Sequence, residues 1–274
     1  MEGFDSKDCN EDTSEKIMSN FSNEYRMPLT IIFSTLGLIA RRLSEKQDDT
    51  MKAYLKLVTQ NCYRLLRLSN NMTEIMKYRA GLNMLHLKNG DICQFTEGLC
   101  KAAGILTGAA GVKLSYHLPK QNIITAFDPA KLSVVFFNLF SNSCKYTQEG
   151  NQIKVKLEQR DRQVVITIAD QGMGVSNDII DRIFEPYFSF NPNGNPFGGA
   201  GLGLTLARYI VLQHGGTIAV KSREGEGTTV AFVLPIRQVG DIPDYTAEKS
   251  VDYLSDRFSM LYVELSDVCG CPMP

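Results

Sequence analysis

Apolar residues recur every three or four positions through the first part of the chain. One such stripe, sustained over about four heptads, consists of Met18, Phe21, Tyr25, Leu29, Ile32, Leu36, Ile39 and Leu43. The polar stretch 44–50 then predicts a turn. A second stripe follows it and consists of Met51, Leu55, Val58, Cys62, Leu65, Leu68 or Ser69, Met72 and Ile75. The pattern predicts an antiparallel helical hairpin over residues 14–80.

A lone hairpin cannot bury two apolar stripes of this length. Two hairpins packed together as a four-helix bundle bury both, so we expect a homodimer. Residues 1–13 are acidic and polar and are expected to form a disordered start.

The pattern changes after Gly81 to shorter runs of mixed type. Helices are expected at 92–107, Pro129–Tyr146 and about 202–214, where His214-Gly215-Gly216 ends the last one. Strands are expected at 112–117, 123–126, 152–158, 164–169, 217–222 and 228–234. This alternation predicts an α+β protein in which an α/β sandwich, residues 89–236, follows the hairpin, with helices covering one face of one sheet. Residues 237–274 form a tail with a short helix at about 250–257 and a strand at 260–265.

Composition excludes several classes of protein. The net charge of −1 gives no basis for binding nucleic acid. No run approaches the ~20 apolar residues of a membrane span, and no secretory signal pattern is present, so we expect a cytoplasmic chain. Seven cysteines without a CxxC pair indicate neither a disulfide framework nor a zinc site.

Candidate chemistry begins on the predicted helix from Pro129. Asn138 and Asn142 are four residues apart and share one face, with Lys145 three residues further on. Amide oxygens suit Mg²⁺, a hard cation that also binds phosphates, and Lys145 adds positive charge for the same phosphates. The alternative is an ordinary polar helix face, since Asn and Lys are common on surfaces.

Two glycine motifs lie further along. Asp170 follows a strand and precedes Gly172 and Gly174, so its carboxylate can accept from an exocyclic amine while backbone approaches a ring closely. The loop 198–203 leads into a helix whose N-terminus attracts phosphate, and it supplies Gly199, Gly201, Leu202 and Gly203. Residues 185–197 between the motifs are expected to form a mobile lid. The Gly225–Thr229 hairpin places Thr228 as a further candidate near phosphate.

In this order and at these separations, the motifs resemble a sensor histidine kinase of two-component signalling. Asn138–Lys145 matches that family's N box, Asp170–Gly174 its first glycine box, Phe184–Phe188 its F box and Gly199–Leu204 its second glycine box. The resemblance covers about residues 14–234. It implies a Bergerat-type (GHKL) ATP site with Mg²⁺, in which Tyr146 also contacts nucleotide, and a response regulator as partner.

The same resemblance implies roles for single residues. Asp170 would read the adenine amine, and Asn142 would be the main Mg²⁺ ligand beside Asn138. Related ATPases carry a glutamate base at the position of Asn138. An amide cannot take a proton from water, so this site suits phosphoryl transfer to protein rather than hydrolysis.

The family's phosphoacceptor histidine is replaced. The family string reads His, Glu, any residue, Arg, any residue, Pro, Leu, and this chain has Asn23, Glu24, Arg26, Pro28 and Leu29 in that frame. An amide nitrogen is not a nucleophile for phosphate, so Glu24 has nothing to activate. A structural or surface role is expected for the three histidines of the chain, which are His86, His117 and His214.

Three explanations of Asn23 stay open. The chain is a pseudokinase that binds ATP and regulates by dimerisation, or it phosphorylates a histidine on a related kinase, or the asparagine is an introduced substitution. Any membrane association would come through a sensor partner or a further segment.

Overall fold

The computed structural model describes residues 49–79, 84–189, 200–240 and 259–269, and seven single positions: Pro28, Ile31, Ile32, Thr35, Ile39, Gly81 and Tyr245. The chain divides into two compact units, residues 1–66 and 67–274. No described helix is both long and apolar enough to cross a membrane.

The first unit contains the start of helix α2 (Asp49–Arg79), which continues into the second unit. This helix confirms the helix expected from the second apolar stripe. The five described positions between Pro28 and Ile39 are also helical. The remainder of the first expected helix, the turn and the start 1–13 lie outside the described residues. Along α2, Cys62 of the apolar stripe is exposed, and Leu66 beside the stripe keeps 38% of its surface.

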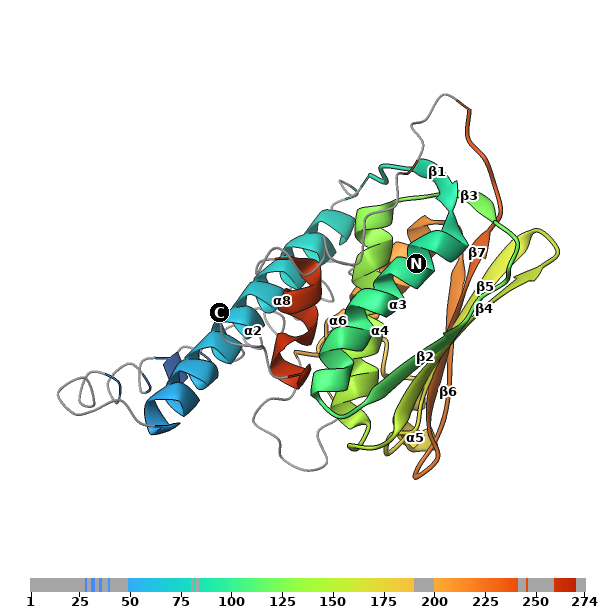
Figure 1. Cartoon of the computed structure of the whole chain (residues 1–274). Coiled ribbons are helices and arrows are strands. Elements are labelled where there is room, and N and C mark those ends of the chain that lie inside the picture. The colour runs from blue at the N-terminus through green and yellow to red at the C-terminus, as the bar shows by residue number, and fades with distance from the viewer. Residues whose placement is uncertain are drawn as a thin grey trace, which may run out of the picture. The chain divides into compact units, whose positions relative to one another are not determined.

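The second unit is built on a five-stranded sheet (Figure 1), in the order β2-β4-β5-β7-β6. The strands are β2 (Lys113–His117), β4 (Gln152–Arg160), β5 (Gln163–Asp170), β7 (Gly227–Pro235) and β6 (Thr217–Arg223). Only the β2–β4 pair is parallel. A separate antiparallel pair joins β1 (Lys88–Asp91) to β3 (Ile124–Phe127). The expected strand at 123–126 therefore exists but lies outside the main sheet.

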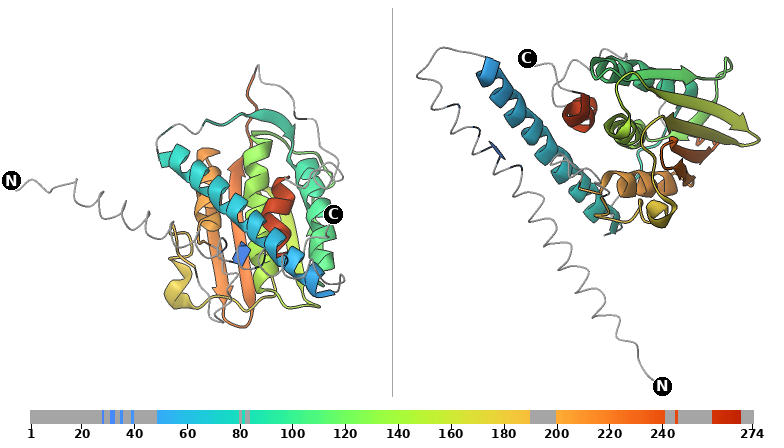
Figure 2. Two further views of the ribbon diagram at one scale, coloured as in Figure 1. Left: turned by 90° about the vertical axis from the view of Figure 1, so that its left-hand side faces the viewer. Right: turned by 90° about the horizontal axis from the view of Figure 1, so that it is seen from below.

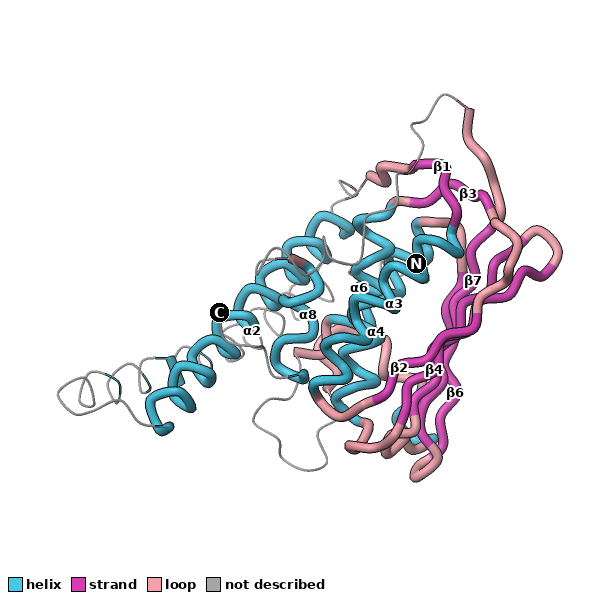
Figure 3. Tube along the Cα trace, in the orientation of Figure 1, coloured by secondary structure: helices cyan, strands magenta, loops and turns pink. Residues whose placement is uncertain are grey.

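Three helices cover one face of the sheet, as Figure 3 shows: α3 (Ile92–Ala109), α4 (Pro129–Tyr146) and α6 (Gly203–Gln213). Figure 2 shows the same layers from two further directions. The predicted α/β sandwich is confirmed. Its core contains an aromatic cluster in which Phe95, Phe136 and Phe232 are buried, with the ring centroids of Phe136 and Phe232 5.5 Å apart.

Three elements differ from the expectation. The polar segment β1 and the short helix α5 (Asn177–Ile180) carry no apolar alternation and were not predicted. The expected strand at 260–265 is wrong, because helix α8 (Met260–Cys269) occupies it and packs on α3 and α4. A segment lying on helices has no strand edge to pair with, so its backbone hydrogen bonds must be internal. The expected helix at 250–257 lies outside the described residues.

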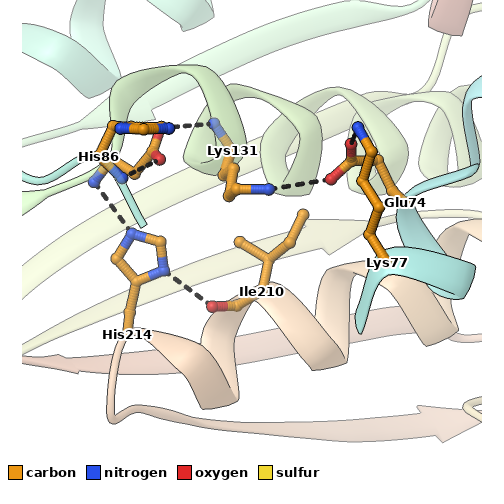
Figure 4. Close-up of polar contacts among 7 residues, drawn as sticks. Glu74, Lys77, His86, Lys131, Ile210 and His214 are labelled. Atoms are coloured by element: carbon orange, nitrogen blue, oxygen red, sulfur yellow. Dashed lines mark hydrogen bonds and ion pairs between the residues drawn. The ribbon is translucent and has the colours of Figure 1, made fainter. Parts of the chain in front are cut away.

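A buried polar network fixes the start of α4 (Figure 4). Asp128 caps the helix, its Oδ1 accepting from the Lys131 N–H at 3.1 Å and its Oδ2 from the His86 N–H at 2.8 Å. The Asp128 N–H donates to Nε2 of His214 at 3.0 Å. Nδ1 of His214 lies 2.8 Å from the Ile210 carbonyl oxygen. A neutral imidazole satisfies both contacts, since Nδ1 donates and Nε2 accepts.

The last turns of α2 join the same unit. The Lys131 Nζ pairs with the Glu74 carboxylate at 2.9 Å, as Figure 4 also shows. The rings of Tyr78 and Tyr209 stack with centroids 4.1 Å apart. These contacts tie residues 67–79 to α4 and α6, so this part of α2 moves with the sandwich.

We expect the buried histidine to make the protein sensitive to acid. Burial lowers the pKa of His214, so the folded state disfavours the proton that the unfolded state accepts. The stabilisation is therefore complete above the unfolded pKa of about 6.5 and is lost as the pH falls through the lower folded value. Chemical denaturation across this range measures the loss.

His214→Ala should remove that pH dependence and lower the free energy of unfolding at neutral pH by about 1–3 kcal/mol, because the Asp128 N–H loses its acceptor. The exposed His117 provides the matched control, His117→Ala. Retention of the full pH dependence in His214→Ala would contradict this assignment.

Candidate active site

The polar face of α4 brings four of the predicted residues together. Asn138 is 4% exposed and its Nδ2 donates to the Val134 carbonyl at 2.9 Å, whereas Asn142 is half-buried and its side chain makes no hydrogen bond to a described residue. The Lys145 Nζ lies 4.9 Å from the ring centroid of Tyr146. Of the two amides, Asn142 is therefore the one open to an ion.

Asp170 ends strand β5 and is held from three sides. Its Oδ1 accepts from the N–H groups of Gly172 at 2.9 Å and Thr228 at 3.1 Å. Its Oδ2 accepts from the Ser143 hydroxyl at 3.2 Å. Burial raises the pKa of this carboxyl, and the three hydrogen bonds act against that rise by favouring the charged form. The result is a carboxylate that presents only acceptors.

The loop after Asp170 runs close to α4. The Met173 N–H donates to the Tyr146 carbonyl at 3.1 Å, and a Cβ on Gly172 would overlap that same carbonyl oxygen. Gly174 adopts φ +69°, where a side chain would also meet the Arg223 carbonyl. Both glycines are therefore required for the loop to lie against the end of α4.

The second glycine motif sits at the start of α6. Gly203 begins the helix, and a Cβ there would overlap Oδ1 of Asn138. Neither a side-chain cap nor an acidic residue occupies the first turn, so its N–H groups remain available to an anion. Leu202 is buried, and the Gly201 carbonyl accepts from the Tyr187 N–H at 3.1 Å. These contacts place the loop directly against the asparagine face of α4.

Thr228 lies at the Asp170 end of this arrangement. Its hydroxyl is 2.9 Å from that of Ser222, which in turn accepts from the Val175 N–H at 2.8 Å. The backbone N–H of Thr228 thus holds Asp170. Its side chain, through Ser222, holds the loop that follows Asp170 at Val175.

Some predicted residues are not placed. Gly199 and residues 190–197 of the expected lid lie outside the described residues, as do Asn23 and Glu24. Two residues were missed, Ser143 and Ser222. Ser143 stands next to Asn142 in the N-box segment, so its position on the same helix was a usable signal. Ser222 carries no signal in the sequence.

Comparison with known proteins agrees with this geometry. Residues 127–238 match the family model described as histidine kinase-, DNA gyrase B- and HSP90-like ATPase. The chain is 29% identical over 221 residues to the histidine protein kinase DivJ of Caulobacter vibrioides. It is 28% identical over 227 residues to the sensor histidine kinase WalK of Bacillus subtilis. Both alignments cover 81% of this chain and 37% of the relative, so the chain spans little more than a third of these proteins.

Solved structures share the fold. The histidine kinase AdeS of Acinetobacter baumannii superposes with a TM-score of 0.60 at 20% identity, covering 78% of this chain and 98% of AdeS. The histidine kinase ThkA in complex with the response regulator protein TrrA gives 0.62 at 22% identity, with 81% and 61% coverage. Full-length ShkA in complex with AMPPNP gives 0.58 at 20% identity, with 81% and 46% coverage.

Asp170→Ala should abolish binding of adenine nucleotide, measured by calorimetry with ATP and magnesium. The substitution removes the carboxylate that Gly172, Thr228 and Ser143 hold in place. The adenine amine then has no acceptor at this position. Asp178→Ala, at an exposed position on α5, is the control and should bind like the parent chain. An unchanged affinity in Asp170→Ala would refute the site.

Proposed function

We infer that this chain, a homologue of the sensor histidine kinases with an ATP-binding domain of the histidine kinase-, DNA gyrase B- and HSP90-like family, is the phosphoryl-transfer core of a two-component signalling protein. The observation that carries the proposal is the arrangement along α4. At one end of this helix the acceptor-only carboxylate of Asp170 accepts from Ser143, and further back Asn138 lies against the glycine-rich start of α6. One end suits an adenine amine and the other a phosphate chain.

Mg²⁺ fits the residues present. The Asn142 amide is half-buried and has no other described partner, so its oxygen can ligate a cation that keeps most of its waters. Asn138 is enclosed between Val134 and Gly203, which favours a supporting role next to the metal. When bound, the ion neutralises charge on the phosphates. Lys145 lies one turn further along the same helix as a second source of positive charge.

The chemistry favours transfer over hydrolysis. Asn138 occupies the place of a glutamate base in related ATPases, and its amide cannot activate water. Phosphate would instead pass to a protein histidine and on to a response regulator, in line with the structural likeness to ThkA in its complex with TrrA. Because Asn23 cannot accept phosphate, the recipient is a histidine on another chain.

We propose that the two segments predicted from the sequence have separate functions. Residues 14–80 form the dimerisation and phosphotransfer hairpin, and residues 89–236 bind ATP. The exposed apolar positions Cys62 and Leu66 of α2 support a homodimer, or a dimer with a related kinase, because they need a partner surface. A core that uses ATP and a response regulator belongs in the cytoplasm, and a sensor partner or segment would connect it to a membrane.

Asn23 also supports a second candidate, a pseudokinase. Such a chain would bind ATP and sequester a regulator or pair with a true kinase, without any transfer of phosphate. The ATP site is compatible with this function, because nucleotide binding requires none of the acceptor residues.

Labelled ATP distinguishes the two candidates. The chain alone should acquire no acid-labile label, and a co-incubated histidine kinase that has its acceptor histidine but an inactivated ATP site should acquire one. Asn23→His should gain label on the chain itself, because an imidazole nitrogen is a competent nucleophile. If neither the partner nor Asn23→His is labelled although ATP binds, the kinase proposal fails and the pseudokinase stands.

Asn142→Ala should weaken ATP binding in the presence of magnesium at least tenfold, a loss of about 1.4 kcal/mol. In EDTA the variant and the parent should bind ATP equally weakly, because the lost group acts through the ion. Calorimetry in both buffers measures this difference. An equal loss in both buffers would show that Asn142 acts without the metal.

A further inference from the structure

Ser143 makes an unusual contact for a buried helical serine. Such hydroxyls ordinarily donate back to the carbonyl four residues earlier. Ser133 on the same helix does so to Pro129 at 2.8 Å, and Thr96 does so to Ile92 at 2.7 Å. Ser143 is 6% exposed, and its hydroxyl instead reaches Oδ2 of Asp170 at 3.2 Å, from a residue 27 positions further along the chain.

The two carboxylate oxygens of Asp170 accept different numbers of hydrogen bonds from the protein. Oδ1 already accepts two backbone N–H groups, from Gly172 and Thr228, so its direction is fixed. Oδ2 is the oxygen left for a ligand, and the Ser143 hydroxyl is its only described partner. Since a carboxylate cannot donate, the Ser143 hydroxyl must donate its single hydrogen to Asp170. Its oxygen can then act towards a ligand only as an acceptor.

The pair therefore presents acceptors alone to a neighbouring base. A purine with an exocyclic amine, such as adenine, can donate to it. A purine with a carbonyl at the same position, such as guanine, would oppose acceptor to acceptor and leave buried polar groups unpaired.

We propose that Ser143 is a positioning residue for base recognition, which holds Oδ2 of Asp170 in the orientation that selects a 6-aminopurine nucleotide. The proposal rests on the ATP-binding function proposed above and deepens it. Ser143 acts through Asp170, and it links base recognition to the helix that carries Asn142.

The test compares nucleotides with and without the amine. Calorimetry measures the binding of ATP and of purine riboside 5′-triphosphate, which lacks the amine, to the full chain in magnesium buffer. Ser143→Ala should weaken ATP binding by about three- to tenfold, the effect of one lost hydrogen bond. Its affinity for purine riboside triphosphate should not change, because that ligand has no amine to place. Discrimination between ATP and GTP should fall by the same factor as ATP binding.

Two further variants separate positioning from a general structural effect. Ser143→Thr keeps the hydroxyl and should restore the preference for ATP over purine riboside triphosphate. Ser133→Ala removes an equally buried hydroxyl of α4, at 6% exposure, and should leave that preference intact. Circular dichroism checks that each variant is folded, and alanine is well tolerated within a helix.

The outcomes are distinct. An equal loss for both nucleotides in Ser143→Ala, no loss for either, or no rescue by threonine would each overturn the role of Ser143. If the parent chain binds ATP normally in those cases, the proposed function survives. Failure of the parent chain to bind ATP would instead refute the proposed function, and the role of Ser143 would fall with it.

Discussion

The candidate site depends on the carboxylate of Asp170, which is largely buried and must receive hydrogen bonds from the protein. Burial disfavours its charge, and no described cation compensates for it. The charge is supported by hydrogen bonds from a loop, a strand and a helix, through Gly172, Thr228 and Ser143. These donors come from segments up to 85 residues apart, so the site can form only after the sheet has paired and α4 has docked on it.

Helix α4 contributes one face to the core and the other face to the candidate site. Its apolar face buries Phe136 and Phe140 in the core. Its polar face carries Asn138, Asn142 and Ser143 toward the loops at the end of β5 and the start of α6. The Asp128 cap and the His214 contact fix where the helix begins, and the close approach of Gly203 to Asn138 fixes how α6 lies against it. Because interiors are close-packed, a shift of α4 in the core would displace every group of the site together.

Helix α2 spans the boundary between the two units of the chain. Its apolar positions repeat along its whole length, but their surroundings differ. Leu68, Met72 and Ile75 are buried, as is Met51 near the start of the helix, whereas Cys62 and Leu66 are exposed. A periodic pattern thus predicts which side of a helix is covered, and it does not reveal whether a second chain or the same chain covers it.

The sequence by itself determined the class of fold, the bounds of α4, the approximate positions of most strands, and the glycine-flanked segments that meet α4, because periodicity, Asp and Pro at a helix start, and glycines at tight turns are local signals. It was wrong about residues 260–265, since a short apolar run becomes helix or strand according to the surface that receives it. It also missed the contacts of Ser143 with Asp170 and of Ser222 with Val175, which join segments distant in the chain. Only the tertiary structure decided these points, because hydrogen bonds between remote segments follow from packing and leave no periodic trace in the sequence.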